Sequence, residues 1–159
     1  MLANLALGRA AELRVASELL LRGHEVFLTL VDSGADLVMG NGKRIQVKAS
    51  HRVFNKSAHY PDYTFAFKSW RSNEGKYEAH KLNNVDFVIL WAVNDDKFFI
   101  IPADIVRGKY SIRLGLSKRK WSEYMPYESK WELLESQAER EVMPNAVKQT
   151  TCDRFVSII

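Results

Sequence analysis

The stretch GADLVMGNGKRIQVKAS, residues 34–50, decides the fold of this chain. Apolar residues lie on both sides of Gly40-Asn41-Gly42, which is a turn sequence typical of a β-hairpin. Three polar residues, Asp36, Gln46 and Lys48, interrupt the apolar runs. Because side chains alternate along a strand, Gln46 and Lys48 share one face of the hairpin.

The length of the loop decides which face Asp36 joins. A two-residue turn at Asn41-Gly42 would place Asp36 opposite Val47, on the apolar face. A three-residue loop, in which Gly42 takes the left-handed conformation of a bulge, places Asp36 opposite Gln46. In that register the polar side chains converge on one face, and the other face fills the core with Leu37, Met39, Ile45 and Val47.

The remaining pattern predicts an α/β domain of mixed α+β type, in which a helix precedes a largely antiparallel sheet. A helix is expected over residues 2–22, where Gly23 ends it. Strands are expected at 24–31, 36–39, 43–49, 64–70, 85–93, 97–103 and 110–116. A short helix is expected at 103–108, and a closing helix with Pro126 near its start is expected at 126–140. Residues 51–63 and 71–84 are expected to be loops. Trp91 and Trp131 are assigned to the core.

The composition describes a globular protein of one domain. The chain has 159 residues, of which 47% are hydrophobic and 26% are charged. Its longest apolar run, residues 87–93, is too short to span a bilayer, and the N-terminus has no signal-peptide pattern. The single cysteine, Cys152, allows no intramolecular disulfide, which fits a cytoplasmic location.

Charge is distributed unevenly along the chain, which has a formal net charge of +4. Residues 107–121 contain six Lys or Arg and no acid, whereas residues 123–141 contain six Glu. This layout suits a protein with one face turned toward phosphates. The alternative is two solvated surface segments of opposite sign.

Convergence of Asp36, Gln46 and Lys48 predicts a site for a hard cation. Carboxylate and amide oxygens, together with the carbonyl of Val47, are ligands of the kind that Mg²⁺ takes. Protonated Lys48 cannot be a ligand, but it can orient a water or stabilise a pentacovalent phosphate. The alternative is an amphipathic hairpin with an Asp–Lys pair across its strands.

Residues 34–50 resemble the core of the PD-(D/E)XK nucleases, in which an Asp is followed on the next strand by an acid or amide, one residue, and Lys. Residues 7–27 are similar to the first helix of the archaeal Holliday-junction resolvases of that superfamily. Residues 86–106 are similar to the second hairpin of its small endonucleases, among them intron-encoded homing endonucleases. Gln46 departs from the acid found in many members, which puts a second tightly held metal in doubt.

The resemblance implies a restriction-endonuclease-like core over residues 1–137, with a C-terminal extension at 138–159 that serves oligomerisation. It implies a Mg²⁺-dependent DNA endonuclease, with Mn²⁺ as a substitute, that acts as a dimer or tetramer. The expected activity is site-specific cleavage of the homing type. The alternatives are resolution of branched DNA at Holliday junctions, or DNA binding without catalysis.

The same resemblance assigns roles to individual side chains. Glu12 is expected to join Asp36, Gln46 and Lys48 as a catalytic residue, and to bind metal with Asp36, Gln46 and Val47. An alternative for Glu12 is a side chain at the edge of the helix that reaches solvent. The resemblance also implies that Arg9 contacts phosphate. Other DNA contacts are expected from position near Lys48 or from the basic segment, namely Arg52, Lys56, Arg113, Lys118, Arg119 and Lys120.

Overall fold

The computed structural model describes residues 2–30, 34–54, 61–71, 75–80, 82–115 and 122–135. Helices and turns alternate with short strands along the chain. The elements are α1 (Leu2–Leu21), β1 (Val26–Leu28), β2 (Leu37–Met39), β3 (Arg44–Ser50), β4 (Arg52–Phe54), β5 (Pro61–Ala66), β6 (Lys68–Arg71), β7 (Lys76–Ala79), β8 (Phe87–Ala92), the 3₁₀ turn η1 (Val93–Asp95), β9 (Lys97–Pro102), α2 (Ala103–Val106), β10 (Ser111–Gly115), η2 (Met125–Tyr127) and η3 (Trp131–Leu134).

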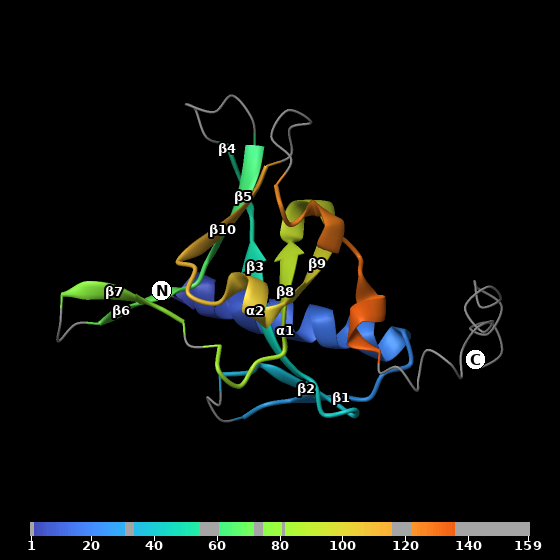
Figure 1. Cartoon of the computed structure of the whole chain (residues 1–159). Coiled ribbons are helices and arrows are strands. Elements are labelled where there is room, and N and C mark those ends of the chain that lie inside the picture. The colour runs from blue at the N-terminus through green and yellow to red at the C-terminus, as the bar shows by residue number, and fades with distance from the viewer. Residues whose placement is uncertain are drawn as a thin grey trace.

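A five-stranded mixed sheet in the order β1-β2-β3-β8-β9 forms the centre of the fold. Its neighbouring strands are antiparallel except for β3 and β8, which run parallel. A three-stranded sheet, β10-β5-β4, and the β6-β7 hairpin complete the strands. Figure 1 shows α1 lying across the central sheet and the β6-β7 hairpin projecting away from the body. The expected mixed α/β class is therefore confirmed.

Apolar side chains pack on both faces of the central sheet. One cluster joins α1 and η3 to the face that carries Ile45, Val47 and Ile89. The other joins β5, β10 and α2 to the face that carries Val88 and Leu90. Strand β8 supplies both clusters by alternation, as expected for a strand in the middle of a sheet covered on both sides.

The register of the first hairpin agrees with the three-residue loop. Leu37 pairs with Ile45 and Val38 with Arg44, so the loop runs from Gly40 to Gly42. Gly42 has φ +85°, the left-handed conformation that the bulge requires. The four apolar residues expected on the core face, Leu37, Met39, Ile45 and Val47, are all buried in the cluster beneath α1.

The predicted helix over residues 126–140 is wrong for its described part. The two 3₁₀ turns η2 (Met125–Tyr127) and η3 (Trp131–Leu134) form there instead, with three non-helical residues between them. Glu128 bridges to Phe99 at the open edge of β9, and the Ser129 amide donates to the Phe98 carbonyl at 2.8 Å. Ser129 has φ +55°, which no helix accommodates. Pairing with the sheet edge therefore overrides helix propensity, while residues 136–140 lie outside the described part.

Four smaller expectations also need correction. The predicted loop 51–63 contains β4 and the start of β5, and the predicted loop 71–84 contains β7. The first strand is confined to Val26–Leu28. Trp131 is buried as expected, but Trp91 is only half-buried, and its indole N–H donates to Asp96 Oδ1 at 2.7 Å. Among the described helices, none is both long and apolar enough to cross a membrane.

The left-handed glycine of the hairpin provides a test of its register. Gly42→Ala should lower the free energy of unfolding by about 1–2 kcal/mol, because an L residue is strained at this φ. No atom lies within 4 Å of the added Cβ, so crowding contributes nothing. Gly42→Asn, which tolerates this conformation, should lose less. Urea unfolding measures both, and equal losses for Ala and Asn would contradict the assigned loop.

Candidate active site

The candidate site is a hollow of about 380 Å³ between the N-terminal half of α1, strands β2 and β3, and strand β5. The four side chains predicted to be catalytic come from three places in the fold. Glu12 comes from α1, Asp36 from the residue before β2, and Gln46 and Lys48 from β3. The hollow is lined by Asn4, Leu7, Gly8, Glu12, Asp36, Gln46, Val47, Lys48, Ala49, Thr64 and Ala66. All four side chains predicted to be catalytic thus meet in one place.

Asp36 is fixed at the point where β2 and β3 stop pairing. Its Oδ2 accepts a hydrogen bond from Gln46 Nε2 at 2.5 Å and another from the Val47 amide at 2.7 Å. The last paired residues of the two strands are Leu37 and Ile45, so Val47 has passed the end of β2. The carboxylate therefore accepts the hydrogen bond that a backbone carbonyl would accept if β2 and β3 stayed paired as far as Val47.

Two residues that line the hollow, Gln46 and Val47, also carry neutral oxygens. In an extended strand the N–H and C=O of one residue face the same neighbour. Because the Val47 amide faces Asp36, the Val47 carbonyl lies on that edge of β3 as well. The Gln46 amide nitrogen donates to Asp36, so the Gln46 amide oxygen takes no part in that hydrogen bond.

Glu12 lies mostly buried beside the hollow, and 19% of its side chain is exposed. Burial raises the pKa of the Glu12 carboxyl above its usual 4.5, and the negative charge of Asp36 raises it further. The charges of Arg9 and Lys48 act in the opposite direction. The Arg9 guanidinium donates to Glu12 Oε2 at 2.5 Å. Two carboxylates held close together in this way favour binding of a cation.

Lys48 is the cation of the hollow. Burial lowers the pKa of its ammonium below the usual 10.5, while the charges of Asp36 and Glu12 oppose that shift. A desolvated ammonium attracts an anion more strongly than a hydrated one, because a lower local dielectric constant screens the charge less. The position of Lys48 therefore suits stabilisation of negative charge on a phosphate.

The donor set fits a hard divalent ion, with Asp36, Glu12, the Gln46 amide oxygen and the Val47 carbonyl as oxygen ligands. No cluster of three or more His, Cys, Asp or Glu side chains with metal-binding geometry exists in the part of the chain that the structure describes. Any cation in this hollow would therefore depend on the amide and the main-chain carbonyl as well as on the two acids.

The arginines expected to bind DNA are each paired with a carboxylate in the DNA-free chain. Arg52 forms an ion pair with Asp95, and Arg113 forms one with Asp62. Arg9, whose side chain is 57% exposed, is paired with Glu12 at the rim of the hollow. A phosphate would therefore share or replace these carboxylates. The other expected DNA contacts, Lys56, Lys118, Arg119 and Lys120, lie outside the described residues.

Strand β5 contributes a wall that the sequence analysis did not assign to the site. Thr64 and Ala66 line the hollow from this strand. Residues 64–70 show only a short run of alternating character, and no motif indicates that the strand crosses the polar face of β3. Strand β5 belongs to the second sheet, in which it pairs with the preceding strand β4 and with the distant strand β10.

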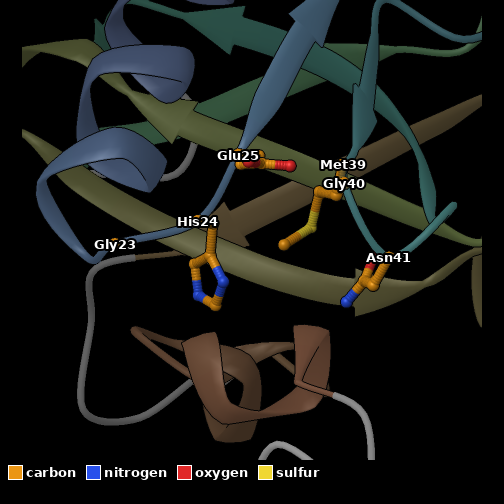
Figure 2. A pocket seen from close by; sticks show the side chains of 6 residues that line it. All are labelled: Gly23, His24, Glu25, Met39, Gly40 and Asn41. Carbon is orange, nitrogen blue, oxygen red and sulfur yellow. The ribbon is translucent and has the colours of Figure 1, made fainter.

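A second hollow of about 420 Å³ lies at the opposite end of α1. It is lined by Gly23, His24, Glu25, Met39, Gly40 and Asn41. In Figure 2 the His24 ring and the Asn41 amide point toward the turns of the C-terminal segment, and Asn41 Nδ2 donates to the Leu134 carbonyl at 3.0 Å. Glu25 is its one acid, so this hollow lacks the paired carboxylates and lysine of the first.

Comparisons with known proteins bear on the fold and on the family of the chain. The fold is similar to that of a bacterial homing endonuclease, I-Ssp6803I, with a TM-score of 0.69 and 21% sequence identity. The alignment covers 81% of this chain and 90% of that chain. A search of curated proteins found no match. Residues 4–134 match the sequence model of the PD-(D/E)XK endonucleases, and the chain therefore belongs to that family of nucleases.

Proposed function

We propose that this nuclease is a metal-dependent DNA endonuclease that hydrolyses phosphodiester bonds at specific sites. The observation that carries the proposal is the carboxylate of Asp36, which is held by Gln46 and Val47 in the same hollow as Lys48. An acid, an amide and a half-buried ammonium in one hollow match what phosphodiester hydrolysis needs: ligands for a cation and a group that stabilises phosphate charge.

Asp36, Gln46, Glu12 and the Val47 carbonyl would hold Mg²⁺, or Mn²⁺ in its place. When bound, the metal supplies Lewis acidity toward the phosphodiester and its attacking water. In this proposal the charge of Lys48 positions the phosphate, and Thr64 and Ala66 of β5 form one wall of the hollow. Arg9 pairs with the Glu12 carboxylate at 2.5 Å at the rim of the hollow.

The nuclease domain in this proposal spans residues 1–137, and residues 138–159 form an extension. The matched range, residues 4–134, lies inside those bounds. In this proposal, side chains around the hollow contribute to recognition of the DNA site. The similar fold of a homing endonuclease supports this choice over branched DNA.

Substitution of the site residues tests the activity. Asp36→Asn keeps an oxygen for the Val47 amide but removes the charge, and Lys48→Ala removes the cation. Each should reduce cleavage at least about 100-fold, the usual effect of losing one transition-state contact. DNA binding without metal should stay within a few fold. Cleavage of supercoiled DNA in Mg²⁺ measures the rate.

Matched variants control for changes of surface charge alone. Asp104→Asn removes an acid whose side chain is 82% exposed, and Lys97→Ala removes the partner of Glu128. Both should cleave like the unmodified chain. Cleavage at the normal rate by Asp36→Asn or Lys48→Ala would contradict the assignment of the site. If the unmodified chain cleaves four-way junctions but no linear duplex, its function is junction resolution and not site-specific cleavage.

The raised pKa of Glu12 gives a test that needs no DNA. Ionised Glu12 is disfavoured in the folded chain, so its cost to stability is present above the raised pKa and absent below the usual 4.5. In EDTA at pH 7, Glu12→Gln should therefore be more stable than the unmodified chain, and the difference should vanish as the pH falls. Thermal unfolding at several pH values measures it.

Addition of Mg²⁺ should reverse that order. The metal should raise the unfolding temperature of the unmodified chain more than that of Glu12→Gln, because binding to the folded state stabilises it. An equal response of both proteins would show that Glu12 is no ligand. A less stable Glu12→Gln protein in EDTA would show that the ion pair with Arg9 outweighs burial of the carboxylate.

A further inference from the structure

Gly8 lies in the interior of helix α1, where another residue would make the helix more stable. Glycine inside a helix lowers stability relative to alanine, because glycine loses more backbone freedom on folding. Gly8 is not among the described residues with a positive φ, so its backbone conformation does not require glycine either. The reason for a glycine must therefore come from what surrounds this position.

Packing within the folded chain does not supply that reason. Apart from its chain neighbours and the adjacent helix backbone, a Cβ added at Gly8 meets no atom within 4 Å in the part of the chain that the structure describes. Gly40 shows the contrast, because a Cβ added there would lie 2.9 Å from Glu25 Cβ. Gly40 is thus needed by packing, whereas Gly8 leaves space that the described chain does not fill.

The space beside Gly8 belongs to the hollow of the candidate active site. Gly8 lines this hollow together with Asn4 and Glu12, which lie one turn before and one turn after it on the same face of α1. The missing side chain therefore widens the hollow beside the carboxylate of Glu12.

A second short side chain lines the hollow from another element. Ala66 of β5 is exposed, and it lines the hollow from that strand. Strands favour β-branched and aromatic residues, and alanine is depleted in them. Gly8 and Ala66 are thus both shorter than the residues that a helix and a strand favour. Positions where local preference is violated are expected at functional sites, so the space between these two residues points to a ligand.

We infer that Gly8 and Ala66 keep open the path by which the sugar–phosphate backbone of the cut DNA strand reaches Lys48. This inference rests on the proposed function, because it takes the ligand to be DNA. The absence of a Cβ at Gly8 lets a strand approach the main chain of α1 closely. Asn4 lies next along this wall, and side-chain amides of this kind donate to phosphate oxygens in protein–DNA complexes. Gly8 and Ala66 therefore determine what enters the hollow, and neither side chain is a metal ligand.

Substitution of Gly8 should change stability and cleavage in opposite directions. Gly8→Ala and Gly8→Leu should each raise the ratio of folded to unfolded chain about two- to fivefold, since alanine and leucine are better helix formers than glycine. Cleavage of supercoiled DNA in Mg²⁺ should fall as the new side chain grows, by at least about 100-fold for Gly8→Leu, because misplaced reacting groups cost a factor of that order. Urea unfolding and initial cleavage rates measure the two effects on the same preparations.

Ala10→Leu is the matched control for added bulk on α1. Ala10 is exposed on the same helix and does not line the hollow, so the same new side chain there should leave cleavage unchanged. Ala66→Val tests the other wall. Valine suits a strand better than alanine, so this variant should keep or gain stability while its cleavage falls.

Two further measurements distinguish a blocked path from a damaged metal site. Mg²⁺ should raise the unfolding temperature of Gly8→Leu as much as that of the unmodified chain, because the metal ligands are unchanged. With Ca²⁺ in place of Mg²⁺, which takes oxygen ligands of the same kind, Gly8→Leu should bind a linear duplex at least about fivefold more weakly, the smaller of the usual costs of overfilling a space. Ala10→Leu should bind the duplex like the unmodified chain.

Cleavage by Gly8→Leu at the rate of the unmodified chain would overturn the inference and leave the proposed function intact. A lost response of Gly8→Leu to Mg²⁺ would also overturn it, since the loss of cleavage would then come from the metal site. If the unmodified chain binds duplex but does not cleave it, the proposed function fails and duplex affinity decides the inference. Weaker binding by Gly8→Leu would then support the path, and equal binding would overturn it. A chain that neither binds nor cleaves DNA would overturn both.

Discussion

The Asp36 carboxylate accepts a hydrogen bond from the backbone of β3 at a point where the backbones of β2 and β3 no longer pair. Its Oδ2 accepts from the Val47 amide and from Gln46 Nε2, one step beyond the last backbone pair of β2 and β3. A buried amide without a partner costs about 1–3 kcal/mol, so the aspartate is needed where the strands part. The same contact fixes the acid at the rim of the hollow, and the position of the candidate site follows from it.

Gln46 limits the negative charge of the site. A glutamate at that position would place a third acid beside Asp36 and Glu12, and like charges at such distances raise one another's pKa. The Gln46 amide instead donates to Asp36 at 2.5 Å, and its other polar atom is a neutral oxygen that adds no negative charge. Lys48 supplies the only positive charge that β3 adds to the hollow, and its burial concentrates that charge on whatever anion enters.

Local rules predicted the parts of the fold that depend on neighbouring residues. Turn chemistry at Gly42 and alternation along β3 were enough to predict the hairpin register and the convergence on Asp36. Glu12 and Arg9 came from resemblance, because no spacing rule links a helix to a hairpin. The error at residues 126–140 has a tertiary cause, since the edge of β9 captures Glu128 and Ser129. The wall formed by β5 depends on a second sheet that no local pattern indicates.

The central claim is that the oxygen of Gln46 belongs to a metal site, and a Mg²⁺ titration of DNA cleavage tests it most directly. Gln46→Glu keeps an oxygen and adds charge, so cleavage should persist and reach half its maximum at a lower Mg²⁺ concentration. Gln46→Leu keeps the size but removes the oxygen, so cleavage at limiting Mg²⁺ should fall at least about tenfold while metal-free DNA binding changes little. Cleavage by Gln46→Leu equal to that of the unmodified chain at limiting Mg²⁺ would contradict the claim.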